Sequence, residues 1–375
     1  MKVFIFYSTA GEGHKKIGEA IAEEFRSQNA AIDVRTFDAL GWGSALVKKG
    51  YTGFYFFAVK YASSFWWLLY ESSDRATVYR WLKPIREWWN QIQSKSLRGF
   101  VHRENPDIII STHFYAAQVF ASAKRRKEIT SRLITVLTDV MPHTFWVNDG
   151  TDIYWVMAEE SKSNLIKRGV RAGQIIVGGI PIRKEFSIKE DRKKLNEKFR
   201  FNPNGPIVLF TSGSFGVGPT EALLEELGNF SSKIQVVVIC GQNEALYHRL
   251  SSQKFSFPII IAGFVTNMHE YMSIADILIA KPGGSTTCES LAKELPMLIS
   301  APIPGQETRN AAWLLNKGAS FEIKKRGDLT QMLKRILDEP TKLETAKEKI
   351  RMVAKPKASS DLVQFLMTSF DDAKI

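Results

Sequence analysis

The sequence predicts an α/β protein with two Rossmann-like domains that face each other across a cleft. The first observation is length, because 375 residues exceed one ordinary domain and suit two domains with separate cores. The second is the alternation of short apolar runs with helical patterns, which is typical of parallel sheets. The third is that each half opens with a strand, a small-residue loop and a helix, at Val3–Thr9 and at Ile207–Thr211.

The order of these patterns divides the chain into four parts. We expect an N-terminal domain over residues 1–180, a charged linker over 181–200, a C-terminal domain over 201–355 and a helical segment over 356–375 that returns to the first domain. An insertion at 42–100 interrupts the N-terminal domain. Strands are predicted at Val3–Thr9, Pro106–Thr112, Arg132–Thr138, Asp152–Ala158, Gln174–Gly179, Ile207–Thr211, Gln235–Cys240, Pro258–Ala262, Ala275–Ala280 and Met297–Ala301.

The charge balance indicates an acidic partner. The formal net charge is +12 and the isoelectric point is near 9.5. The sequence contains no recognised nucleic-acid-binding module and no long Lys/Arg tract, so an anionic membrane is favoured over nucleic acid. Its longest uncharged apolar stretches have about ten residues, roughly half of what a membrane-spanning helix needs. Cys240 and Cys288 are far apart in sequence, which suits a reducing cytosol rather than a disulfide framework.

The segment 263–310 carries the most informative pattern. An apolar run is followed by Pro-Gly-Gly, a helical pattern and a second apolar run, which predicts a β-α-β unit. Gly283 and Gly284 allow close approach of backbone N–H groups, and Ser285 or Thr286 begins the helix. Such a helix start is a seat for an anion, equivalent to about half a positive charge. A turn that only joins strand to helix explains this first pattern equally well.

A second polar cluster follows the next strand and should lie on the same edge of the sheet. It contains Gln306, Glu307 and Asn310, and Glu289 lies one turn into the preceding helix. Amides and carboxylates of this kind can read sugar hydroxyls, so a phosphate seat beside them predicts a nucleotide-sugar site.

At these residues the sequence resembles the diacylglycerol glycosyltransferases, through GFV–x2–M, KPGG–x–T–x2–E and PIPGQE–x2–N. That family includes bacterial processive glucosyltransferases and plant monogalactosyldiacylglycerol synthases and has the GT-B architecture. The resemblance extends over nearly the whole chain. It implies a UDP-sugar donor and diacylglycerol as acceptor, with Glu289 on the ribose, Gln306 and Glu307 on the hexose, and Phe264 and Val265 on the base.

Other loops at the carboxyl ends of the C-terminal strands are weaker donor-site candidates. One follows Ile207–Thr211 and the other follows Gln235–Cys240. The complete set of predicted donor-site residues is Ser212, Gly213, Ser214, Phe215, Asn243, Phe264, Val265, Gly283, Gly284, Ser285, Thr286, Glu289, Gln306, Glu307 and Asn310.

The loop after the first strand contains Gly11, Gly13 and His14. A dinucleotide fingerprint would need a third glycine where Lys16 stands, so that motif is not supported. From the residues alone, a histidine at a helix start is more often a cap or a surface residue than a catalytic group. The resemblance implies that Gly13 and His14 belong to the acceptor-side loop and that His14 is catalytic.

The loop after Arg132–Thr138 matches the family pattern T-D-x3-H-x2-W with Asp139, His143 and Trp146. By itself, a polar residue after an apolar strand is ordinarily a turn former. The resemblance places Asp139 in the catalytic site and the other two residues on the acceptor side. His113 follows the strand Pro106–Thr112 and should lie at the same edge of a parallel sheet as His14, so it is also predicted on the acceptor side.

The insertion at 42–100 contains six of the nine tryptophans and several basic residues. Aromatic rings favour the headgroup layer of a membrane, and basic residues are attracted to anionic lipids. An aromatic-rich insertion packed on its own domain is the alternative. We expect membrane or acceptor contacts from Trp42, Phe56, Phe57, Trp66 and Trp67, at the cytoplasmic face of the cell membrane.

The predicted reaction is an inverting transfer of glucose or galactose from a UDP-sugar to the sn-3 hydroxyl of diacylglycerol. His14 or Asp139 serves as base, or Asp139 orients His14. The chain contains no D-x-D motif, so we expect neither a metal nor another cofactor. Three alternatives remain: a lipid I N-acetylglucosaminyltransferase, a UDP-sugar 2-epimerase, and a membrane-bound UDP-sugar sensor without turnover.

Overall fold

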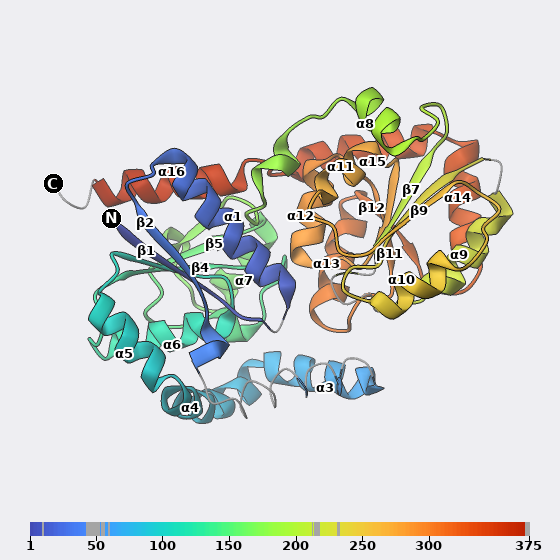
Figure 1. The fold of residues 1–375 in the computed structure, drawn as a ribbon. Coiled ribbons are helices and arrows are strands. Elements are labelled where there is room, and N and C mark those ends of the chain that lie inside the picture. Colours follow the sequence, from blue (N-terminus) through green and yellow to red (C-terminus); the bar gives the residue numbers. More distant parts are fainter. Residues whose placement is uncertain are drawn as a thin grey trace.

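The computed structural model contains two parallel six-stranded sheets, each flanked by helices (Figure 1). It describes residues 1–9, 11–42, 53, 57–58, 61–211, 213, 218–230 and 233–371. The predicted α/β fold with two Rossmann-like domains is therefore confirmed. Within the described ranges, no helix is both long and apolar enough to cross a membrane.

The N-terminal sheet has the order β2-β1-β3-β4-β5-β6. Strand β1 pairs with β2 on one side and with β3 on the other, so the chain reverses its direction of winding at β1. In open α/β sheets, ligands bind at the carboxyl ends of the strands where this reversal occurs. The strands are β1 (Lys2–Tyr7), β2 (Asp33–Asp38), β3 (Ile108–Ser111), β4 (Arg132–Val136), β5 (Ile153–Val156) and β6 (Ile175–Val177).

The C-terminal sheet has the order β12-β11-β10-β7-β8-β9. Its reversal lies at β7, which pairs with both β8 and β10. The predicted anion seat follows β10 and therefore lies beside this point. The strands are β7 (Ile207–Thr211), β8 (Gln235–Ile239), β9 (Ile259–Ala262), β10 (Ile277–Ala280), β11 (Met297–Ser300) and β12 (Ser320–Ile323).

Helices cover the faces of both sheets. In the first domain α1 illustrates the reason, because Ile17, Ile21 and Phe25 recur every four residues and are all buried. The helices of the first domain are α1 (Glu12–Gln28), η1 (Ala39–Trp42), α3 (Ser63–Asp74), α4 (Ala76–Gln93), α5 (Lys95–Glu104), α6 (Phe114–Arg125), η2 (Thr144–Trp146), α7 (Glu159–Lys167) and η3 (Ala172–Gln174).

The remaining helices belong to the connection, the second domain and the C-terminal segment. They are η4 (Lys184–Ser187), α8 (Arg192–Phe199), α9 (Thr220–Leu227), η5 (Gly228–Phe230), α10 (Glu244–Ser251), α11 (Met268–Ile274), α12 (Gly284–Ala292), α13 (Gln306–Asn316), α14 (Asp328–Asp338), α15 (Thr341–Val353) and α16 (Ala358–Asp371).

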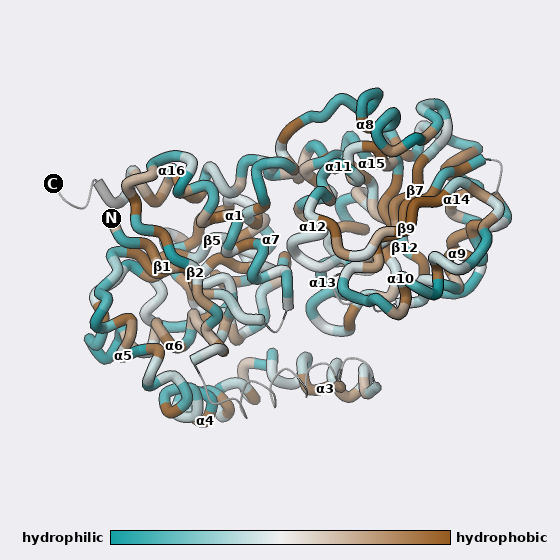
Figure 2. The backbone as a smooth tube through the Cα atoms, in the orientation of Figure 1, coloured by the Kyte–Doolittle hydropathy of each residue, from teal (hydrophilic) through white to brown (hydrophobic). Residues whose placement is uncertain are grey.

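The apolar core follows the sheets, whose central strands form the brown centre of each domain in Figure 2. The largest hydrophobic cluster is continuous across the domain boundary. Met157 and Ile180 of the first domain and Cys288 of the second belong to it, and the Cys288 Sγ lies 3.8 Å from the Met157 Sδ. The boundary between the domains is thus partly a packed core.

The chain crosses between the domains twice, and the two crossings touch. The first leaves β6 through Gly179, which has a φ of +89°. A Cβ on Gly179 would lie 2.4 Å from the Cβ of Lys355 in the returning segment. The Ser359 hydroxyl donates a hydrogen bond of 2.6 Å to the Ile182 carbonyl. After the second crossing, α16 packs against α1 of the first domain (Figure 1).

Two strands are absent from the sequence prediction, and a helix lies where it expects the linker. β2 contains Asp33, Arg35 and Asp38, and β12 is only four residues long, so neither has the long apolar run that identifies a buried strand. Both are edge strands. The predicted linker contains α8, whose first turn is capped by the Asp191 carboxylate.

Candidate functional site at the domain junction

The carboxyl edges of the two sheets meet in direct contact. Helix α1, which follows β1, contacts α12, which follows β10. A Cβ on Gly284 would lie 1.7 Å from the Thr138 carbonyl oxygen, so only glycine permits this approach. A Cβ on Gly13 would lie at an ordinary 3.8 Å from the Ser285 Cβ. The predicted acceptor loop and the predicted anion seat are therefore neighbours.

His14 lies in the first turn of α1, and its ring is fixed by the neighbouring strand loops. Its Nδ1 is 2.7 Å from the Thr112 carbonyl and 3.2 Å from the Thr138 hydroxyl. A carbonyl only accepts, so Nδ1 carries the proton and Nε2 carries the lone pair. Burial lowers the pKa of His14 to about 4, which keeps the imidazole neutral at pH 7. Among the described residues, the ring is thus oriented by Thr112 rather than by a hydrogen bond from Asp139.

Asp139 follows β4 and faces the second domain. Burial raises its pKa to about 6, against a hydrogen bond with Asn310 and the positive charge of Arg309, which both lower it. A pKa close to neutrality suits proton transfer. Strand β4 pairs with β3, and the Thr112 carbonyl in the loop after β3 contacts the His14 ring. Asp139, in the loop after β4, therefore lies at the same edge of the sheet as His14.

Asn310, predicted to bind the donor, joins the domains in this structure. It is fully buried on α13. Its Oδ1 accepts from the Val140 amide at 3.0 Å, and its Nδ2 donates to the Pro282 carbonyl at 3.0 Å. Its amide is thus committed to the two backbones and to Asp139.

The start of α12 has the features of an anion site. Gly283 is its N-cap residue and supplies no side-chain cap, which leaves N–H groups of the first turn available. Ser285 donates a hydrogen bond of 2.8 Å to the buried Glu289 carboxylate. Glu307 approaches from α13, where burial raises its pKa and the Ile303 amide donates to it at 2.7 Å. Thr286 is half-buried in the same turn of α12.

The other predicted donor residues lie around the same sheet edge. Phe264, directly after β9, is 57% exposed, whereas Val265 packs against the large core cluster. Asn243 caps α10 by accepting from the Leu246 amide. Gly213 has a φ of +72°, and Gln306 is half-buried at the start of α13. Ser212, Ser214 and Phe215 lie outside the described residues.

Two histidines of the acceptor side have structural partners. His113 is buried, its ring centroid is 4.7 Å from that of His14, and its Nδ1 accepts from the Tyr115 amide to cap α6. His143 is buried as well, and its Nε2 donates to the Tyr70 carbonyl at 3.0 Å. His143 therefore connects the loop after β4 to α3 of the insertion.

The insertion contributes residues to the junction that the sequence analysis missed. Tyr70, Glu71 and Asp74 lie at the end of α3 and contact Arg309 of the second domain. The Arg309 guanidinium lies 5.0 Å from the Tyr70 ring centroid. Arg309 stands between two motif residues in sequence, which is the one signal that could have drawn attention to it. Nothing in the aromatic segment distinguishes Tyr70 from its neighbours.

Two of the predicted acceptor or membrane residues pack against other side chains of the first domain. Trp42 stacks on Phe100 with ring centroids 4.6 Å apart, at the margin of a core cluster. Trp146 is only 2% exposed and packs inside the first domain. Both rings fill the domain because apolar area is most stable away from water. Phe57 and Trp67 are exposed, Trp66 is half-buried, and Phe56 lies outside the described residues.

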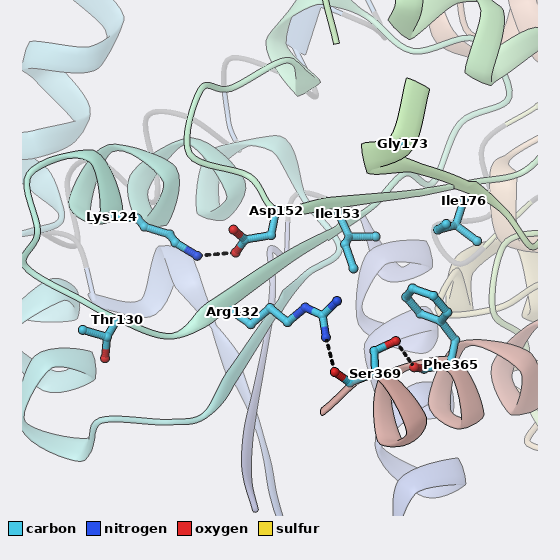
Figure 3. Close-up of a pocket in the computed structure, with 9 residues that line it drawn as sticks. All are labelled: Lys124, Thr130, Arg132, Asp152, Ile153, Gly173, Ile176, Phe365 and Ser369. Atoms are coloured by element: carbon cyan, nitrogen blue, oxygen red, sulfur yellow. Dashed lines mark hydrogen bonds and ion pairs between the residues drawn. The ribbon is translucent and has the colours of Figure 1, made fainter. Parts of the chain in front are cut away.

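A separate hollow of about 620 Å³ lies at the opposite edge of the first domain (Figure 3). It is bordered by Arg132 and Asp152 at the starts of β4 and β5 and by Phe365 of α16. None of the predicted site residues lines it. Among the described residues, no group of three or more His, Cys, Asp or Glu side chains could hold a metal ion. That no metal takes part stays a prediction.

The two halves of the chain match two family models. Residues 14–182 match monogalactosyldiacylglycerol (MGDG) synthase, and residues 207–363 match the glycosyltransferase family 28 C-terminal domain. Processive diacylglycerol beta-glucosyltransferases from Bacillus cytotoxicus and Bacillus thuringiensis are 27% and 28% identical to the chain. In each case, the match covers 98% of this chain and 93% of the relative. The chain is a glycosyltransferase that is similar over nearly all of its length to the diacylglycerol glycosyltransferases.

Solved structures with the same fold include other proteins of two such domains. MurG from Acinetobacter baumannii has a TM-score of 0.61 at 14% identity and covers 98% of this glycosyltransferase and 99% of its own chain. The UDP complex of MnaA from S. aureus has a TM-score of 0.64 at 11% identity, covering 99% and 97%. At these identities, the similarity establishes the GT-B fold of the glycosyltransferase.

The contact at Gly284 gives a prediction about closure of the glycosyltransferase. Gly284→Ala should prevent the domains from meeting as they do here, because the new methyl group would collide with the Thr138 carbonyl. We expect a larger radius of gyration by small-angle X-ray scattering without ligand. Gly283→Ala is the matched control, since its Cβ would lie 3.6 Å from the nearest atom, a Glu307 oxygen. An unchanged radius for Gly284→Ala would contradict the prediction.

Proposed function

We propose that this protein transfers glucose or galactose from a UDP-sugar to the sn-3 hydroxyl of 1,2-diacylglycerol, with inversion at the anomeric carbon. The glycolipid so formed is a second possible acceptor. The reaction takes place on the cytoplasmic face of the cell membrane, to which the protein binds peripherally. The observation that carries the proposal is the position of His14 directly across the junction from the start of α12.

The supported mechanism is a single displacement. The Nε2 lone pair of His14 accepts the proton of the acceptor hydroxyl as its oxygen bonds to the anomeric carbon. The bond from that carbon to the diphosphate breaks, and UDP leaves with the electron pair. The hydrogen bond from Nδ1 to the Thr112 carbonyl holds the ring in the required tautomer and helps to stabilise the imidazolium that forms.

Asp139 is proposed to support this charge rather than to orient the ring. Its raised pKa of about 6 leaves it mostly ionised at pH 7, and it directly follows Thr138, whose hydroxyl lies 3.2 Å from the His14 Nδ1. At the other side of the reacting carbon, the diphosphate gains charge as it leaves. We propose that the α12 N–H groups stabilise this charge, in place of a metal held by a D-x-D motif.

An exposed apolar surface supports action at a membrane. On α4, Trp81, Ile85 and Trp88 recur at helical spacing and are 81%, 65% and 60% exposed. Phe65 and Trp67 extend this surface along α3. Exposed apolar side chains in this number indicate a docking surface. The surface also includes Leu68, Leu69, Leu82, Trp89 and Ile92.

Basic side chains beside this surface favour anionic lipids as its partner. Arg75 and Arg80 are exposed at the start of α4, and Lys95 is exposed at the start of α5. Each can contribute about 1 kcal/mol of attraction near an anionic bilayer. By contrast, the Lys83 ammonium forms an ion pair with the Asp149 carboxylate at 2.9 Å, which connects α4 to the loop before β5.

The exposed surface also separates this proposal from a UDP-sugar 2-epimerase. A UDP-sugar 2-epimerase works on a water-soluble substrate and has no use for a lipid surface. MurG and the epimerases share the fold, so the fold itself does not discriminate among them.

The activity itself is tested by incubating the protein with diacylglycerol vesicles and each labelled UDP-hexose. We expect labelled glycolipid from the wild-type protein, and a decrease of about 10²- to 10⁴-fold for His14→Ala, because a general base contributes that much. UDP binding by calorimetry should be nearly unchanged in the variant. Turnover of His14→Ala close to the wild-type rate would place the base elsewhere, and no product from the wild-type protein would refute the function.

The pH profile distinguishes the roles of His14 and Asp139. The wild-type rate should fall below about pH 6 as the carboxylate is protonated, since burial raises the pKa of Asp139 to about 6. Asp139→Asn should be slower, with an acid limb near pH 4, where His14 gains a proton that blocks its role as base. The measurement is kcat/KM from pH 3.5 to 8. A variant with no activity at any pH would make Asp139 the base.

Membrane docking predicts a loss of vesicle binding when the α4 stripe is made polar. The triple variant Trp81→Ser, Ile85→Ser and Trp88→Ser should bind phosphatidylglycerol vesicles at least about tenfold more weakly, because each side chain loses apolar burial. Met352→Ser is the control, since Met352 is 76% exposed on α15 of the other domain. Co-sedimentation measures both, and equal binding would exclude this docking surface.

A further inference from the structure

Helix α3 divides the lipid-facing surface from the domain junction. Its exposed side chains include Phe65, Trp67 and Leu68, and none of its residues is fully buried. Its last turn instead carries polar contacts through Glu71 and Asp74. In Figure 1 the helix extends from the first domain along the second. Because α3 has no buried residue, its position depends strongly on this polar end.

Asp74 fixes the end of α3 to the first domain. Its carboxylate accepts from the Thr144 amide at 2.7 Å and pairs with Arg168 at 2.9 Å. Burial alone would raise the pKa of Asp74, but His143 and the hydrogen bonds from Thr144 and Arg168 outweigh it and hold that pKa far below its usual range. The carboxylate is therefore charged at all physiological pH values.

Arg309 fixes the same turn of α3 to the second domain. Its Nη1 donates to the Asp74 Oδ2 at 2.7 Å, and its Nη2 donates to the Glu71 Oε1 at 2.9 Å. Glu71 is 36% exposed and Asp74 only 9%, so the pair with Asp74 is the better shielded from water. One guanidinium thus contacts two carboxylates of α3 and faces the Tyr70 ring.

The second domain also has a seat for Tyr70. Gly305 has a φ of +97°, and a Cβ there would lie 2.7 Å from the Tyr70 ring. Gly305 and Arg309 are four residues apart around the start of α13, so they form one surface that receives α3. The same helix carries Asn310, which contacts the Val140 amide of the first domain.

We propose that Arg309 is a positioning residue that couples closure of the two domains to the placement of α3, and through α3 to presentation of the lipid acceptor. The inference rests on the proposed function. When the donor domain closes, Arg309 and Gly305 reach the last turn of α3 and hold it against the first domain. When the domain opens, α3 keeps only its contacts with the first domain and the neighbouring α4.

The coupling has a direct physical basis. Two carboxylates and two guanidinium groups meet at this turn, and one guanidinium comes from each domain. If Arg309 is removed, Asp74 keeps its ion pair with Arg168, whereas Glu71 has no other cationic partner among the ion pairs of the described residues. A ligand that favours the closed state then also favours the ordered position of α3, by reciprocal linkage.

Hydrogen exchange of residues 63–74 tests the coupling without any need for turnover. UDP alone is the probe. In the wild-type protein, UDP should slow exchange in α3, whereas in Arg309→Gln exchange should be about tenfold faster and insensitive to UDP. Arg351→Gln is the matched control, because it removes an exposed Arg–Glu pair of 2.7 Å within the second domain. UDP-independent exchange in the wild-type protein would overturn the proposal.

Steady-state kinetics with diacylglycerol vesicles provide the second measurement. Arg309→Gln should raise KM for diacylglycerol about tenfold, and by reciprocal linkage it should raise the Kd for UDP by at most a similar factor. Arg309→Lys, which keeps one charge but cannot contact both carboxylates, should be intermediate. Adding Glu71→Gln to Arg309→Gln should cause little further loss, because the two changes remove the same contact.

The possible failures are distinguishable. An unchanged KM, additive effects of the two changes, or a loss of UDP affinity far beyond about tenfold in Arg309→Gln would each overturn the role of Arg309. Faster exchange throughout α13 and its sheet would show a general structural role instead. If the wild-type protein forms no glycolipid, the proposed function fails, while the effect of UDP on α3 still decides the coupling.

Discussion

Close backbone contact between the two domains is the constraint on which the site depends. Gly284 can approach the Thr138 carbonyl because it has no Cβ, and the Asn310 amide joins the Val140 and Pro282 backbones beside it. These contacts bring together the ends of β4 and β10, which belong to different sheets. A buried amide satisfied from both sides fixes the register of the interface, because leaving either partner unpaired would cost about 1–3 kcal/mol.

The two sheets explain why the chemistry is divided between the domains. Each sheet reverses its winding at its first strand, β1 or β7, and this places the adjacent loops at one edge. The first domain presents a neutral imidazole held by a backbone carbonyl. The second presents a helix start and two buried carboxylates, Glu289 and Glu307. Neither set is complete unless the edges meet.

The sequence was sufficient for the architecture and for the loops that bear the site, because apolar runs and glycine turns are local signals. It was insufficient for edge strands such as β2, whose charged residues hide the pattern. It also missed the contacts of Tyr70 and Asp74 with Arg309. Asp74 and Arg309 are 235 positions apart in the sequence and come together only in the folded chain. Trp42 and Trp146 pack beside or within core clusters of the first domain, which the position of an aromatic residue near a motif does not reveal.

The paired crossings at Gly179 and Lys355 limit how the molecule can move. A single connecting segment would let the second domain swivel in any direction. Two segments in van der Waals contact, further tied by the hydrogen bond from Ser359 to Ile182, leave rotation about the line through both crossings as the easiest motion. The enzyme should therefore open by rotation about this line, which lies on the opposite side of the molecule from α3 and α4 in Figure 1, so that the nucleotide can enter while those helices keep their place on the first domain.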